Sequence, residues 1–123
     1  MVCLLGCGEP QRGPKLVPAS GSITYQGEPV EGATIVFLPQ DHGFAAVTTS
    51  DDEGNFSLRT PQASPSDGAA PGAYKVTIRK NYMTPEDREI WLLPKPYGHV
   101  QTSGLIADVA TDQDNHYAFK LVD

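Results

Sequence analysis

The chain has 123 residues and a mass of 13.2 kDa, which suits one domain with a single hydrophobic core and is too short for two. Its 9 Lys and Arg against 15 Asp and Glu give a formal net charge of −6. This balance argues against binding to nucleic acid or to an anionic membrane surface, because both require clustered basic side chains. No apolar run approaches the roughly 20 residues that a membrane-spanning helix needs.

Turn-forming residues recur along the chain, with 12 glycines and 11 prolines, and they favour short strands over long helices. Between the turns, apolar and polar residues alternate as they do in half-buried strands. Seven strands are predicted, in chain order, at residues 20–25, 33–37, 45–50, 56–58, 74–79, 105–109 and 117–121. This pattern predicts an all-β fold, a seven-stranded antiparallel sandwich with a prealbumin-like or immunoglobulin-like Greek key.

The predicted core takes the apolar residue at every second position of each strand. Its members are Ile23, Ala33, Ile35, Phe37, Phe56, Leu58, Tyr74, Val76, Ile78, Leu105, Ala107, Val109, Tyr117, Phe119 and Leu121. If each strand crosses the sandwich once, successive turns alternate between its two ends. One end then holds three turns, at 26–29, 51–55 and 80–102. The opposite end holds the other three, at 39–44, 60–72 and 111–115.

Both cysteines, Cys3 and Cys7, precede the first predicted strand. Residues 16–123 therefore contain no disulfide and no thiolate metal site. The stretch Leu4-Leu5-Gly6-Cys7 resembles the lipobox of bacterial lipoproteins, which places an aliphatic residue three positions before the cysteine and a small residue directly before it. In that family the cysteine is acylated and becomes the N-terminus after cleavage. The resemblance implies a lipid anchor at Cys7 and a location on the bacterial cell envelope, facing the periplasm or the exterior.

Residues 1–15 are interpreted as a signal-peptide remnant, the lipobox and a linker. A working signal also needs a basic segment and about 7–15 apolar residues before the cleavage site. Six residues precede Cys7, so the rest of the signal is expected upstream of Met1. The alternative interpretation is an apolar N-terminus with no role.

Three stretches, residues 20–37, 49–58 and 71–78, resemble carboxypeptidase regulatory-like domains, which share a transthyretin-like sandwich. The resemblance covers residues 16–123 and rests on motifs that encode turns and core. With the lipobox, it implies a small envelope lipoprotein. It implies no peptidase activity, because the resemblance is to an accessory domain and the sequence contains no zinc-binding catalytic motif.

An acidic turn is one candidate for chemistry. Asp51, Asp52 and Glu53 could offer carboxylates to calcium, which takes about six to eight oxygens. The simpler interpretation is a solvated hairpin in which an aspartate bonds its own backbone and Gly54 takes a positive φ. The acidic residues of 108–114 belong to the opposite end of the predicted sandwich, so they cannot complete a cation site here.

A second candidate is a set of iron ligands. Tyr97, His99, His116 and Tyr117 are the residue types that hold iron in intradiol dioxygenases, which share the fold class. One residue apart on a strand, His116 and Tyr117 point to opposite faces and cannot share a metal. Hydroxyisourate hydrolases also share the fold, but the Tyr-Arg-Gly-Ser tail of that family is missing here. No Ser–His–Asp set is recognisable either, so the sequence predicts no enzyme activity, no cofactor and no metal.

The segment 80–102 is long for a connection in a compact domain, and such loops often carry function. It contains Tyr82, Trp91 and Tyr97, and Tyr and Trp are enriched at recognition hot spots. The alternative is that Trp91 and the two leucines after it fold back and cover a sheet edge.

These observations predict a non-enzymatic envelope lipoprotein domain with a binding or structural role, whose candidate binding residues are Tyr82, Trp91 and Tyr97. Its expected partners are the membrane, through the lipid, and an envelope protein or glycan, but not nucleic acid. Two alternatives stay open. A carbohydrate-binding module would need these rings exposed in one plane. A small hydrolase or metal-dependent enzyme on the transthyretin-like fold is the other.

Overall fold

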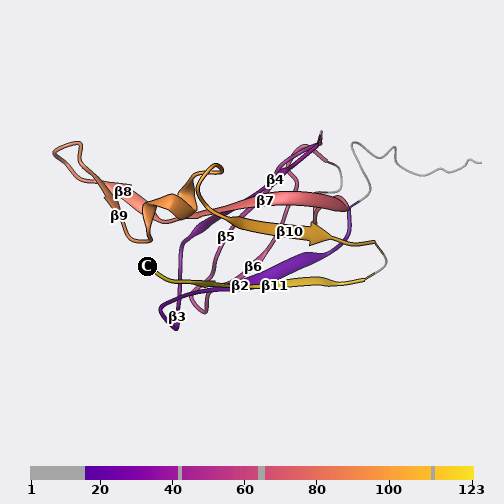
Figure 1. The fold of residues 1–123 in the computed structure, drawn as a ribbon, viewed down its shortest axis with the longest axis horizontal. Coiled ribbons are helices and arrows are strands. Elements are labelled where there is room, and N and C mark those ends of the chain that lie inside the picture. Colours follow the sequence, from indigo (N-terminus) through magenta and orange to yellow (C-terminus); the bar gives the residue numbers. More distant parts are fainter. Residues whose placement is uncertain (1–15, 42, 64–65, 112) are drawn as a thin grey trace, which may run out of the picture.

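The structure is a computed structural model that describes residues 16–41, 43–63, 66–111 and 113–123. Within these residues the chain forms ten strands and one short 3₁₀ helix, η1 (Lys95–Gly98), but no α-helix (Figure 1). The predicted all-β class is confirmed. No helix of the described part has the length and apolar character to cross a membrane.

The strands form two four-stranded sheets and one separate hairpin. The first sheet has the order β10-β7-β4-β5, with bounds Leu105–Val109, Gly72–Arg79, Thr34–Pro39 and Ala46–Thr49. The second sheet has the order β11-β2-β3, with bounds Asn115–Leu121, Ala19–Tyr25 and Glu28–Pro29, and β6 (Asn55–Ser57) also pairs with β2. The hairpin joins β8 (Asn81–Met83) and β9 (Glu89–Trp91). It extends away from the body of the fold (Figure 1).

The strand count and one pairing direction differ from the prediction. All seven predicted strands are present, and the three additional ones, β3, β8 and β9, are only two or three residues long. Alternation cannot reveal strands so short, and Pro29 in β3 resembles a turn residue. In addition, β11 lies parallel to β2, with Asn115 opposite Ala19 and Leu121 opposite Tyr25. The fold is therefore not antiparallel throughout.

The two four-stranded sheets share one hydrophobic core. Thirteen of the fifteen predicted core residues are buried, and the other two, Leu105 and Tyr117, are partly buried and pack against the same cluster. Phe37 of β4 is fully buried, and its ring lies 5.4 Å from that of Tyr117 and 6.2 Å from that of Phe119, both on β11. These aromatic contacts join the two sheets.

Hydrogen bonds from other parts of the chain occupy backbone groups of both edge strands of the first sheet. On the β10 edge, the Tyr117 hydroxyl donates to the Asp108 carbonyl at 2.7 Å. Burial raises the pKa of Tyr117, so its hydroxyl stays protonated and able to donate. On the β5 edge, Arg59 exchanges two backbone hydrogen bonds with Val47, at 2.7 and 3.1 Å. These contacts reduce the free edge available for pairing with another chain.

Candidate functional site

The turns at 26–29, 51–55 and 80–102 meet at one end of the fold, as the alternation of strands predicted. Residues Glu28, Asp52 and Lys80, from three separate turns, line one small cavity at the first end. At the other end, Val17 and Ala69 form an isolated antiparallel bridge. The segment 80–102 therefore lies at the end opposite to the point where residues 16–18 join the fold (Figure 1).

The β8–β9 hairpin carries the most exposed candidate binding residue. Tyr82 is 51% exposed, and its neighbour Met83 is 58% exposed. The turn of the hairpin is fixed by two hydrogen bonds, from the Thr84 N–H to the Arg88 carbonyl at 2.8 Å and from the Arg88 N–H to the Thr84 hydroxyl at 3.1 Å. The hairpin therefore presents an aromatic and a thioether side chain on an ordered support.

Trp91 is partly buried and surrounded by basic side chains. The Arg79 guanidinium carbon lies 5.1 Å from the indole centroid, the Lys95 Nζ atom 5.7 Å, and the His99 ring 5.7 Å. Arg79 also lies 3.9 Å from Glu89. The indole N–H of Trp91 is buried and has no hydrogen-bond partner among the described residues. These contacts and its partial burial leave Trp91 less open to stacking than the exposed Tyr82.

Tyr97 and Leu93 attach the rest of the long segment to the fold. Leu93 is buried in the core, whereas Leu92 is 47% exposed. The Tyr97 hydroxyl donates to the Val122 carbonyl at 2.9 Å and accepts from the Val122 N–H at 3.2 Å. Tyr82 therefore projects from the fold, whereas Leu93 and Tyr97 pack back against it.

In the acidic turn, the Asp51 side chain accepts hydrogen bonds from the backbone of the same turn. One Asp51 carboxylate oxygen accepts the backbone N–H groups of Glu53, at 2.9 Å, and Asn55, at 2.8 Å. Gly54 has φ +80°, and a side chain there would collide with the Ile23 carbonyl. This geometry is that of an aspartate that stabilises its own hairpin.

The four proposed iron-ligand types are not brought together. Tyr97 and His99 lie in and after η1, and Tyr97 contacts Val122, just beyond the end of β11. His116 and Tyr117 lie near the start of the same strand, where His116 is exposed and Tyr117 packs against the core. Four residues, 118–121, lie between Tyr117 and Val122, so Tyr97 contacts the chain at the opposite end of β11 from His116 and Tyr117.

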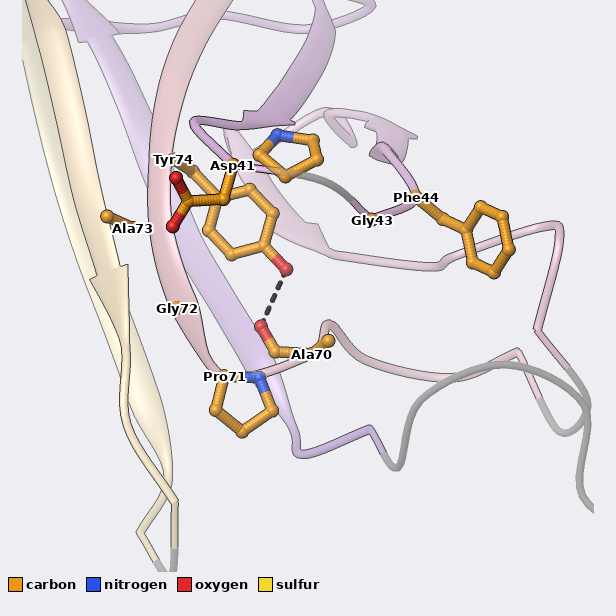
Figure 2. A pocket seen from close by; sticks show the side chains of 9 residues that line it. Asp41, Gly43, Phe44, Ala70, Pro71, Gly72, Ala73 and Tyr74 are labelled. Carbon is orange, nitrogen blue, oxygen red and sulfur yellow. Dashed lines mark hydrogen bonds between the residues drawn. The ribbon is translucent and has the colours of Figure 1, made fainter.

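One cavity, of about 580 Å³, opens between the end of β4 and the start of β7 (Figure 2). The Tyr74 hydroxyl points into this region and donates to the Ala70 carbonyl at 2.6 Å (Figure 2). Burial raises the pKa of Tyr74, which keeps this donor protonated. Asp41 contributes the one carboxylate of the described lining, and most other lining residues are small or apolar. This composition provides no pair of groups for acid–base chemistry.

A larger groove, of about 820 Å³, lies at the end where residues 16–18 join the fold. Its lining includes Ser20, Arg59, Asp67 and His116, of which the sequence analysis considered only His116, as an iron ligand. Ser20 lies directly opposite His116 in the parallel β2–β11 register, and Ser20 Oγ is 3.4 Å from His116 Nδ1. Only knowledge of that parallel pairing could have brought the two residues together.

No family model matches the chain, and no curated protein sequence matches it. Among solved structures, the chain is similar to a 9R-lipoxygenase from Cyanothece PCC8801. The alignment covers 100% of this chain and 18% of that chain, with 11% identity and a TM-score of 0.44. A likeness at this level assigns neither a fold family nor an activity. Cys7, the predicted lipid attachment site, lies outside the described residues.

Proposed function

We propose that this chain is a non-enzymatic binding module of the bacterial cell envelope, anchored through a lipid on Cys7. In this proposal the fold is a carboxypeptidase regulatory-like, prealbumin-type sandwich to which the short strands β3, β8 and β9 are added. The β8–β9 hairpin is its recognition element, and its partner is an envelope protein.

The observation that carries the proposal is the place of the hairpin. It projects from the end of the fold opposite to the point where residues 16–18 join it (Figure 1). A tethered module needs its recognition surface on the side away from the tether, where a partner can reach it. Tyr82 and Met83 expose about half or more of their surface there, and aromatic residues and methionine are enriched in protein interfaces.

A glycan partner is less well supported. Stacking on a sugar needs an open aromatic face, whereas the Trp91 ring is flanked by Arg79 and Lys95, and the Tyr97 hydroxyl is bound to Val122. Tyr82 alone offers a single ring for stacking on a sugar. A protein partner, which uses both apolar area and charge, fits this hairpin better.

The first test concerns the anchor. Expressed with its complete upstream signal, the protein should partition into the detergent phase, and Cys7→Ser should move it to the aqueous phase. Stable anchoring requires about two acyl chains, because one gives only about 10⁴ M⁻¹ of membrane affinity. Cys3→Ser is the matched control and should stay in the detergent phase, since Cys3 precedes the cleavage site. Recovery of Cys7→Ser in detergent would contradict the anchor.

The second test concerns the hairpin. A photo-crosslinking amino acid is placed at Tyr82 in intact cells, with Ile106 as the matched control. Ile106 is 71% exposed and lies on an edge strand of the first sheet, away from the hairpin. A discrete protein adduct is expected from position 82 and not from position 106, and Met83→Asp should remove it. Equal labelling from both positions, or adducts that survive Met83→Asp, would show that the hairpin is not the recognition element.

A further inference from the structure

The groove beside β2 has a floor of polar side chains held in register. His116 on β11, Ser20 on β2 and Ser57 on β6 lie opposite one another across three adjacent strands. Their neighbours Ala19 and Asn115 are buried, so Ser20 and His116 face away from the core. All three polar residues line the groove. The floor therefore offers hydrogen-bonding groups in a row about two strand spacings wide, or about 10 Å.

The backbone around this floor is fixed by buried polar residues. The Asn115 side chain accepts from the Ala110 N–H at 2.9 Å and donates to the Ala110 carbonyl at 3.1 Å and to the Pro18 carbonyl at 3.3 Å. The Thr60 hydroxyl, also buried, donates to the Gly68 carbonyl at 3.0 Å. These bonds position the segments that carry Asp67, Asp114 and His116.

Gly68 allows the two walls of the groove to meet. Its φ is +98°, and a Cβ at this position would overlap the Val17 carbonyl. Ala69 next to it exchanges two backbone hydrogen bonds with Val17, at 2.9 and 3.0 Å. A glycine is needed here because a larger residue would push residues 16–18 away from the wall that carries Asp67.

The charged groups of the walls form no ion pair with one another among the described residues, although Arg59 and Asp67 lie opposite each other in an antiparallel bridge. Arg59 makes one side-chain hydrogen bond, to the Ser66 hydroxyl at 3.3 Å. Within the described residues, the ion pair found at 4 Å or less is Arg79–Glu89, at the other end of the fold. Arg59 therefore lines the same groove as Asp67 and Asp114 without an ion pair to either. Most donors of its guanidinium remain available to a ligand.

We propose that this groove binds a small zwitterion, a free amino acid or a short peptide with an ammonium and a carboxylate group. Arg59 receives the carboxylate, because its guanidinium can donate two parallel hydrogen bonds to it. Asp67 and Asp114 accept from the ammonium group. Ser20, Ser57 and His116 bond the polar atoms between the two ends. A volume of about 820 Å³ lies within the range of about 300–1,000 Å³ that is usual for small-molecule sites.

Other ligand classes fit the groove less well. An anion alone would meet two carboxylates, and a cation alone would meet the guanidinium of Arg59. Apart from the His116 imidazole, no aromatic ring belongs to the described lining, so a sugar has no stacking surface there. A ligand that carries both charges pairs its carboxylate with Arg59 and its ammonium group with Asp67 and Asp114.

The test uses the full chain and three dipeptide probes, with binding measured by calorimetry and by amide chemical shifts. Alanyl-alanine carries both charges, N-acetyl-alanyl-alanine lacks the ammonium group, and alanyl-alanine amide lacks the carboxylate. Alanyl-alanine should bind about tenfold or more tightly than either blocked form, because each blocked form leaves a charged partner unsatisfied. The shifts should map to residues 20, 57 and 116 and not to the β8–β9 hairpin.

Variants assign the two charges. Arg59→Gln should weaken alanyl-alanine about tenfold but leave the already weak amide unchanged, and Asp67→Asn should weaken alanyl-alanine but not the N-acetyl form. Arg88→Gln and Asp52→Asn, at the opposite end, are the controls and should change nothing. The bonds from Arg59 to Val47 are made by the backbone, so Arg59→Gln should keep its thermal midpoint. Equal affinity for all three probes, an unaffected Arg59→Gln, or no binding at about 10 mM, an affinity below about 3 kcal/mol, would overturn the proposal.

Discussion

Phe37→Ala should lower the free energy of unfolding by about 3–5 kcal/mol, the loss expected for a fully buried Phe. Phe37 has no exposed surface, and its ring contacts Tyr74 on its own sheet and Tyr117 and Phe119 on the other. Truncation therefore removes the packing that joins the two sheets and leaves a cavity that rigid strands cannot close. Denaturant unfolding with a fitted slope measures the change.

Asp52→Asn is the control for this measurement. Asp52 lies exposed in the acidic turn, where Asp51 and not Asp52 makes the local hydrogen bonds, so the change should stay within about 0.5 kcal/mol. Phe119→Ala should resemble Phe37→Ala, since Phe119 packs against both Phe37 and Phe56. If all three variants lost the same stability, the inward and outward faces of the strands would be assigned wrongly.

Gly21→Ala should destabilise the protein by about 3 kcal/mol or more, although it adds a single methyl group. A Cβ at position 21 would overlap the Tyr117 carbonyl and would lie 2.6 Å from the Phe56 ring. The first clash is with backbone, so the β2–β11 pairing itself must shift. A stability loss by thermal and denaturant unfolding, with weaker amide protection of residues 115–121, is the expected result.

Ser22→Ala is the matched control on the same strand. Ser22 is the next residue along β2, lies opposite Ala118 and faces the other side of the sheet. Loss of its hydroxyl should cost no more than about 0.5 kcal/mol. A harmless Gly21→Ala would mean that β2 and β11 are not in the register seen here.

The class of fold and most of the core could be predicted because they depend on local alternation. Residues such as Ile35 and Val76 follow a period of two. The turn at 51–55 is specified by its own residues, because Asp51 bonds the local backbone and Gly54 takes a positive φ. The ends at which the turns lie followed from the same rule. Tyr82 was predicted as a candidate, and the structure places it on an exposed hairpin.

The rest depends on contacts between distant parts of the chain. The parallel β2–β11 pair joins residues 96 positions apart, and no local pattern specifies which strands become neighbours. The groove around Ser20, His116 and Arg59 exists only because of that pairing. Similarly, the packing of Arg79 and Lys95 against Trp91 depends on how the segment folds back beside β7, which the order of its residues does not specify.

The parallel pairing of β2 with β11 also affects how the protein can fold. The strand near the start of the domain receives its long partner only after residues 115–121 have been made, so a partial chain cannot complete the second sheet. Long-range pairing of this kind slows folding, because the closure of a large loop precedes the contacts that stabilise it. An N-terminal fragment ending before residue 115 should therefore expose an unpaired β2 edge and aggregate. On the proposed route of export across a membrane, this delay would keep the chain extended until its last strand has emerged.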